Sequence, residues 1–149
     1  MNSKSKGNIG EAIVLAEFVK YGIQVSIPFG DNARYDLIAD FNGKLNKIQV
    51  KYCGLMSPSN SVICKCASST YHTTNKKYIT YEGDIDYFCF YIPLWGKVLL
   101  VPMERIRNRK TINFRKSKPK NNQSNVLFVD EYTFDKTLCV ETLYDEPKE

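Results

Sequence analysis

Gln49 and Lys51 are the residues whose types and spacing first indicate chemistry. They stand one residue apart in the segment 47–53, where apolar Ile48 and Val50 alternate with them. Side chains at i and i+2 share one face of a strand, so the amide and the ammonium would stand together. An amide oxygen can bind a cation, and an ammonium can stabilise developing negative charge. The pair could serve metal-assisted chemistry if carboxylates lay nearby.

Two carboxylates have positions that could meet this pair. Asp36 lies in the strand-like segment RYDLIAD, and the Asn-Gly of the following FNGK predicts a tight hairpin to the Gln49–Lys51 strand. Glu11 projects from a predicted helix that would pack on the same sheet. Two carboxylates and an amide oxygen form a hard oxygen site that suits Mg²⁺. Taken singly, each residue has a plainer interpretation as a strand-end or solvent-facing side chain, and only their order along the chain favours a site.

The elements that must position these residues form an α/β or α+β pattern with a central mixed sheet. A helix is predicted over 7–20, capped by Asn8 or Ser5 and ended by Gly22, with Glu11 in its first turn. The segment 68–83 is polar and aromatic and predicts an irregular stretch or a short helix. The remaining strands are predicted over 23–28, 35–41, 46–53, 61–67, 86–93, 97–102 and 111–115, with a short helix over 103–109, a charged loop over 116–125, and a short strand and helical turn within 126–138.

Composition limits the classes of protein. The 149 residues suit one domain, 1–149, and a hydrophobic fraction of 43% favours a folded globule. The sequence holds no apolar run of bilayer length, and its first ten residues have no signal-peptide pattern, so we expect a cytoplasmic protein without membrane partners. Five Cys, an odd number, favour reduced thiols. The spacing of Cys53, Cys64, Cys66 and His72 matches no standard zinc pattern.

Charge is unevenly distributed along the chain. Residues 97–120 contain nine Lys or Arg and one Glu, whereas residues 126–149 contain two Lys and seven Asp or Glu. A basic block on a folded protein favours a polyanion such as nucleic acid, because Lys and Arg neutralise phosphates and release counterions. A solvated surface strip is the alternative interpretation.

The order helix-Glu, strand-Asp, hairpin, Q-x-K strand resembles the PD-(D/E)-x-K, or restriction-endonuclease-like, nuclease superfamily. The matching segments are GNIGEAIVLAEF, RYDLIAD and IQVKY. The later segments YEGDIDYFCFYIPLWGKVLLVPMERI and FRKSKPKNNQSNVLFVDEY are similar to a smaller group, the intron-encoded homing endonucleases with this fold found in cyanobacteria. Together these segments cover most of the chain up to about Tyr132.

The resemblance implies a site-specific endonuclease that makes Mg²⁺-dependent double-strand breaks in DNA and promotes intron mobility. Glu11, Asp36 and Gln49 would hold the cation, and Lys51 would activate water or stabilise charge. Gln49 replaces the second strand carboxylate of the superfamily pattern, so Glu11 would supply the second anion. Cutting both strands needs two sites and so at least a dimer, and the resemblance implies a homotetramer.

Candidate DNA contacts lie in two extensions, at about 54–80 and 104–120, and in the loop before Asp36. A β-ribbon from the first extension would fit the major groove, and cations in both would contact phosphate. A Holliday-junction resolvase or restriction-type endonuclease of the same fold is an alternative, as is a non-catalytic DNA-binding protein with a degenerate site. The candidate contact residues are Asn32, Arg34, Lys65, Lys76, Lys77, Tyr78, Arg105, Arg107, Arg109, Lys110, Arg115 and Lys116.

Overall fold

The computed structural model describes residues 1–72, 75–118, 121, 123 and 125–139. Its helices are α1 (Ser3–Lys20), α2 (Met103–Ile106) and α3 (Phe134–Leu138), with 3₁₀ turns η1 (Pro93–Trp95) and η2 (Val129–Glu131). Its strands are β1 (Val25–Ser26), β2 (Leu37–Phe41), β3 (Lys44–Tyr52), β4 (Leu55–Met56), β5 (Val62–Lys65), β6 (Ala67–His72), β7 (Asn75–Thr80), β8 (Tyr87–Ile92), β9 (Lys97–Pro102), β10 (Thr111–Arg115) and β11 (Val126–Phe128). None of the described helices is long and apolar enough to cross a bilayer.

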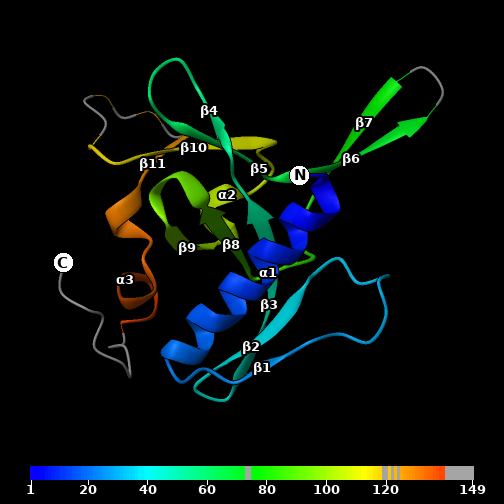
Figure 1. The fold of residues 1–149 in the computed structure, drawn as a ribbon. Helices are drawn as coiled ribbons and strands as arrows, with labels where there is room; N and C mark the ends of the chain where they lie inside the picture. Colours follow the sequence, from blue (N-terminus) through cyan, green and yellow to red (C-terminus); the bar gives the residue numbers. More distant parts are fainter. Residues whose placement is uncertain (73–74, 119–120, 122, 124, 140–149) are drawn as a thin grey trace.

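A five-stranded mixed sheet forms the centre of the molecule, in the order β1-β2-β3-β8-β9 (Figure 1). Strands β3 and β8 run parallel, and the other neighbours are antiparallel. The predicted hairpin between β2 and β3 is confirmed. Its turn residues Asn42 and Gly43 both have positive φ, at 55° and 89°, and Asp40 Oδ1 accepts the Gly43 N–H at 2.6 Å. The turn therefore has the backbone geometry that Asn-Gly sequences favour.

A second, four-stranded sheet has the order β11-β10-β5-β4, and the hairpin β6–β7 forms a separate two-stranded ribbon. The ribbon extends away from the body of the molecule, at the upper right of Figure 1. The sequence predicted an irregular or helical segment over 68–83, and this prediction is wrong for the described residues, because β6 and β7 pair from Ala67–Thr80 to His72–Asn75. The described side chains of the ribbon are mostly polar or exposed on both faces, so apolar periodicity carried no strand signal there.

Alternate residues of β8 and β9 serve the two faces of the central sheet. Phe88 and Phe90 pack with the second sheet, whereas Cys89 and Leu100 pack beneath α1. Helix α1 covers its face with Val14 and Phe18, both fully buried. The Gln49–Lys51 strand is thus held between two packed layers, with Ile48 and Val50 on the helix face as the alternation predicted.

Helix α1 begins earlier than predicted. Asn2, rather than Asn8 or Ser5, is the N-cap, and its Oδ1 accepts the Ser5 N–H at 2.8 Å. Glu11 consequently lies in the third turn, where the helix dipole does little for it. The predicted end is confirmed, since α1 stops at Lys20 and Gly22 takes a φ of 68°. The longer helix brings its first residues beside the end of β3.

Candidate active site

Asp36 is placed by the hairpin directly opposite Gln49. Its N–H donates to Ile48 O at 2.8 Å, one residue before β2 begins. Its Oδ2 accepts two hydrogen bonds, from the Val50 N–H at 2.8 Å and from Gln49 Nε2 at 2.7 Å. The carboxylate is therefore fixed by strand backbone, while Oδ1 accepts no hydrogen bond from any described residue and stays available to a ligand.

Gln49 presents its amide nitrogen, not its oxygen, to Asp36. Nε2 also approaches Val50 O at 3.3 Å, and the side chain is 9% exposed. Binding a cation through Oε1 would require the amide to turn over and release Asp36. The same side chain thus has two uses: it holds Asp36 as a donor, or it supplies an oxygen ligand after rotation.

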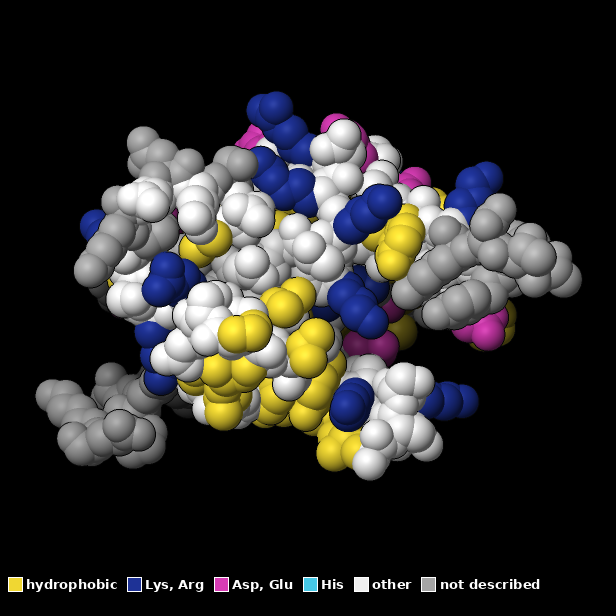
Figure 2. All heavy atoms as spheres, turned by 90° about the horizontal axis from the view of Figure 1, so that it is seen from above, with side chains coloured by type: hydrophobic (Ala, Val, Ile, Leu, Met, Phe, Trp, Pro, Cys, Tyr) yellow, Lys and Arg dark blue, Asp and Glu magenta, His cyan; other side chains and the backbone are white. Residues whose placement is uncertain are grey.

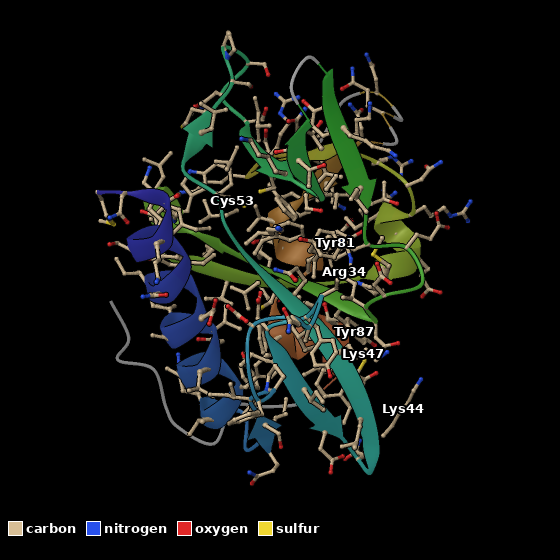
Figure 3. All side chains as sticks on the ribbon, turned by 90° about the vertical axis from the view of Figure 1, so that its right-hand side faces the viewer. Arg34, Lys44, Lys47, Cys53, Tyr81 and Tyr87 are labelled. Carbon is tan, nitrogen blue, oxygen red and sulfur yellow. The ribbon has the colours of Figure 1, made fainter. Side chains whose placement is uncertain are left out.

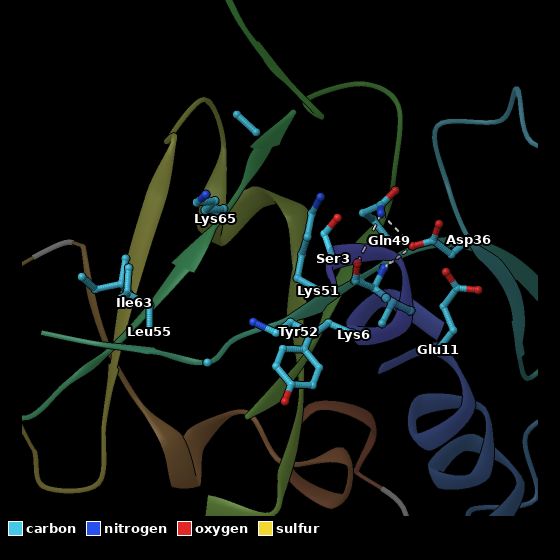
Figure 4. Close-up of a pocket in the computed structure, with 14 residues that line it drawn as sticks. Ser3, Lys6, Glu11, Asp36, Gln49, Lys51, Tyr52, Leu55, Ile63 and Lys65 are labelled. Carbon is cyan, nitrogen blue, oxygen red and sulfur yellow. Dashed lines mark hydrogen bonds between the residues drawn. The ribbon is translucent and has the colours of Figure 1, made fainter. Parts of the chain in front are cut away.

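Glu11 reaches the site because α1 lies directly on β3. A Cβ at Gly10 would sit 3.5 Å from Val50 Cγ1 and 3.7 Å from Tyr52 Cβ, so the helix backbone lies within one side-chain contact of the strand. This close approach turns the next residue, Glu11, toward Asp36 (Figure 4). The Glu11 carboxylate forms no hydrogen bond with the described residues.

Lys51 extends from the same face of β3 as Gln49, as the two-residue spacing predicted. Its Nζ donates to the hydroxyl of Tyr81 at 3.2 Å and lies 4.8 Å from the centroid of the Tyr81 ring. Tyr81 comes immediately after the ribbon and is 6% exposed. Sequence reasoning missed Tyr81, because the segment that carries it was predicted to be irregular.

The four predicted residues line one open cavity of about 600 Å³ (Figure 4). Lys65, a predicted DNA contact, lines it too. Ser3, Lys6 and Tyr52 also lie at its wall, and sequence reasoning missed all three. The signal for Ser3 and Lys6 was the Asn2 cap, which extends the helix to the cavity.

The two carboxylates hold their protons more tightly than free acids do. Burial raises the pKa of Glu11, and the nearby Asp36 charge raises it further. Burial also raises the pKa of Asp36, although the Val50 N–H and the Lys51 ammonium act in the opposite direction. A cation bound between these two carboxylates would stabilise their ionised forms and so offset the cost of burying the charges.

The donor set fits a hard divalent cation. Among the described residues there is no group of three or more His, Cys, Asp or Glu placed to hold a metal ion. A cation in this cavity would therefore draw on Asp36, Glu11, an amide or backbone oxygen, and water. Mg²⁺ commonly binds with one or two carboxylates and keeps several waters.

Replacing Gln49 by Glu tests this arrangement. An ionised glutamate at position 49 has no N–H to donate, so the hydrogen bond from Gln49 Nε2 to Asp36 Oδ2 is lost and two carboxylates face each other. We therefore expect the metal-free variant to have a lower Tm than wild type at pH 7. The third carboxylate should tighten Mg²⁺ binding by about tenfold. Thermal unfolding at increasing Mg²⁺ measures both effects, and exposed Gln24→Glu controls for the added charge. An Mg²⁺-induced rise in Tm equal to that of wild type would contradict the placement of Gln49.

The two extensions that were predicted to contact DNA meet in the structure. Lys110 Nζ lies 4.7 Å from the centroid of the Tyr78 ring on β7, and Lys77 and Tyr78 are exposed. Lys76 belongs to β7, but its side chain lies outside the described residues. Seen from above, Lys and Arg side chains lie on both sides of a recess that contains carboxylates (Figure 2).

Several predicted DNA contacts also bond within the protein. Arg105 Nε donates to the Tyr132 hydroxyl at 3.0 Å, and Arg109 Nη1 donates to Arg105 O at 3.0 Å. Lys116 lies over the Trp95 ring at 5.5 Å. Arg107 is exposed and donates to Glu104 O, Arg115 is half-buried at the end of β10, and Asn32 is exposed in the loop before Asp36.

Arg34 lies at the base of the ribbon rather than in the cavity lining. Its guanidinium donates to Asp84 Oδ2 and to Thr80 O, each at 2.8 Å, and to Ser68 Oγ at 3.3 Å. Its Cζ lies 4.4 Å from the centroid of the Tyr81 ring (Figure 3). The sequence predicted a DNA contact for this residue, but no local pattern could indicate partners 34 to 50 residues away.

Comparisons with known proteins bear on the family and the fold of the chain. A comparison with curated protein sequences gave no match. The solved structure of a bacterial homing endonuclease, I-Ssp6803I, is similar, with a TM-score of 0.73 and 22% identity over 83% of this chain and 84% of the other. That similarity shows the restriction-endonuclease-like fold predicted from the sequence. The model of the PD-(D/E)XK endonuclease family matches residues 1–135. The chain therefore belongs to the PD-(D/E)XK endonuclease family.

Proposed function

We propose that this protein is a site-specific homing endonuclease that makes Mg²⁺-dependent double-strand breaks in DNA and so promotes intron mobility. The observation that carries the proposal is the meeting of Glu11, Asp36, Gln49 and Lys51 in one cavity with cations around it. The similarity of its fold to a bacterial homing endonuclease supports the finer assignment. Hydrolysis would leave 5′-phosphate and 3′-hydroxyl ends.

Each residue has a role that follows from its contacts. Asp36 and Glu11 would hold the cation, and Gln49 would add an oxygen after its amide turns over. Bound Mg²⁺ would polarise the phosphate and favour hydroxide at neutral pH. The Lys51 ammonium, steadied by the Tyr81 hydroxyl, would stabilise negative charge on the phosphate or orient the attacking water.

The ribbon β6–β7 and the basic segment near α2, which meet at Tyr78 and Lys110, would together bind the duplex beside the cavity. A two-stranded ribbon fits the major groove, and the exposed Lys77, Lys65 and Lys110 would contact phosphate. One chain carries one set of catalytic groups, so cutting both strands would take at least a dimer. We propose the homotetramer that the family resemblance implies.

Cleavage of a mixed DNA population tests the function. Purified protein is incubated with genomic DNA and with a duplex library of randomised sequence, once with Mg²⁺ and once with chelator, and the new ends are sequenced. We expect discrete ends on both strands with Mg²⁺ and none with chelator. Preference for a four-way junction would favour a resolvase. Equal binding with and without Mg²⁺, and no nicking, would favour a non-catalytic DNA-binding protein.

A further inference from the structure

Tyr81 occupies a fixed position between two cations. Its ring packs edge-on against Phe88, with centroids 5.4 Å apart and an interplanar angle of 79°. Only 6% of the residue is exposed. The core therefore holds the ring, while its hydroxyl and its faces are left to polar partners.

One of those partners is the Lys51 ammonium, and the other is the Arg34 guanidinium. Lys51 Nζ lies 3.2 Å from the hydroxyl and 4.8 Å from the ring centroid, and Arg34 Cζ lies 4.4 Å from the same centroid. Lys has a flexible stem and a mobile head, so an acceptor and an aromatic ring together restrict where its charge can sit. Lys51 is thereby held at the wall of the cavity that Asp36 also lines.

Arg34 joins this pair to the ribbon. Its three nitrogens donate to Ser68 on β6, Thr80 on β7 and Asp84 in the turn that follows. It is also two residues from Asp36 along the chain. The base of the ribbon, the loop that carries Asp36 and the Lys51 side chain thus share one set of contacts around Tyr81. Figure 3 shows Arg34 beside Tyr81.

We propose that Tyr81 is a positioning residue for Lys51, and that Arg34 fixes Tyr81 to the base of the ribbon so that the seating of the ribbon on DNA governs the placement of the lysine. The inference rests on the proposed nuclease function. It assigns Arg34 to the coupling of recognition with catalysis rather than to direct phosphate binding. A duplex that seats the ribbon correctly keeps the Arg34 contacts, and the ammonium stays in place for the reaction.

The first test is Tyr81→Phe, measured with the preferred duplex under single-turnover conditions. Phe keeps the ring but removes the hydroxyl, so the cleavage rate should fall roughly tenfold or more while DNA affinity stays unchanged. Tyr87→Phe, a half-buried Tyr outside the cavity, is the matched control and should cleave at the wild-type rate. In a Lys51→Ala background, Tyr81→Phe should have no further effect, because its action passes through Lys51.

Arg34→Lys separates the two roles of the arginine. Lysine keeps the charge but loses the planar fork, so the coupling role predicts a slower cleavage rate with DNA affinity within about threefold of wild type. A direct phosphate role predicts weaker binding and little change in the rate at saturating DNA. The second result would overturn the assignment of Arg34.

A measurement without DNA tests the contact itself. The Tyr81 ring current should shift the ε-CH₂ NMR signals of Lys51, identified by their loss in Lys51→Ala, and Tyr81→Leu should abolish the shift. Unshifted signals in wild type would overturn the inference. So would cleavage at the wild-type rate by Tyr81→Phe when Lys51→Ala is inactive. Absence of cleavage by wild type, with the NMR shift intact, would instead overturn the nuclease function and with it any catalytic part for Tyr81.

Discussion

Replacing Lys51 by Ala should lower the DNA cleavage rate by about 10³-fold at saturating DNA and Mg²⁺. This loss corresponds to about 4 kcal/mol of transition-state stabilisation. Lys51 is half-buried, and its charge partly opposes the rise that burial causes in the pKa of Asp36. The substitution removes the cation that β3 holds beside Gln49 at the wall of the cavity.

The effect should appear in the rate and not in the binding step. Single-turnover cleavage and DNA affinity, measured separately, should show affinity within about threefold of wild type, because phosphate contacts are spread over many surface cations. Lys44→Ala is the matched control, since Lys44 is exposed at the start of β3 and lies outside the cavity. A Lys51→Ala rate within tenfold of wild type would remove Lys51 from the mechanism.

The hairpin that carries the site could be predicted because its signals are local. Asn42-Gly43 specifies the turn, and the alternation around Gln49 specifies which side chains share a face. The register that sets Leu37 opposite Ile48 follows from these two signals. The meeting of Asp36, Gln49 and Lys51 was therefore already determined by short-range pattern.

The approach of Glu11 to Asp36 depends on how α1 packs on β3, which could not be predicted from the sequence in detail. Gly10 in the interior of a helix is a weak signal, since glycine there costs stability. The packing of α1 on β3 is visible only in the structure, where a Cβ at Gly10 would lie 3.5 Å from Val50 Cγ1. The extra turn that begins at Ser3 likewise depended on recognising Asn2 as the cap.

The ribbon and the contacts at its base could not be predicted from short-range sequence patterns. Its residues Ser69, Thr70 and Lys77 are exposed and form no buried apolar face. The alternation of apolar and polar residues that predicts a strand is therefore missing from this segment. The Arg34 contacts join residues up to 50 positions apart. The orientation of the Gln49 amide was equally hidden, because only the position of Asp36 decides whether its nitrogen or its oxygen points inward.

Replacing Asp36 by Asn should separate fold from function. The amide oxygen of the new side chain can accept the same two hydrogen bonds, from the Val50 N–H and Gln49 Nε2, so the hairpin should stay intact. The neutral amide cannot offer the charge that a hard cation requires. We expect the cleavage rate to fall by at least about 10³-fold and the Mg²⁺-induced rise in Tm to disappear.

The metal-free Asp36→Asn protein should nevertheless be more stable than wild type at pH 7. The folded-state pKa of Asp36 is raised, chiefly by burial, above that of the unfolded chain. The stability that such a group contributes is fully present below the unfolded pKa of about 4 and is lost as the pH rises through the folded pKa. At pH 7 the ionised Asp36 therefore destabilises wild type, whereas the neutral amide of the variant does not. The difference in Tm should shrink as the pH falls toward about 4.

With Mg²⁺ bound, wild type should become more stable than Asp36→Asn. At a concentration of 100 times its Kd, a cation that binds only the folded state adds about 2.7 kcal/mol, or a rise in Tm of about 5 to 10 °C for a chain of this size. Wild type should show this rise and Asp36→Asn should not. Asp40→Asn, at the turn of the same hairpin and outside the cavity, is the matched control and should respond like wild type. An equal rise in Asp36→Asn would place the cation elsewhere, because the substitution removes the charged ligand while it keeps the hydrogen bonds of the hairpin.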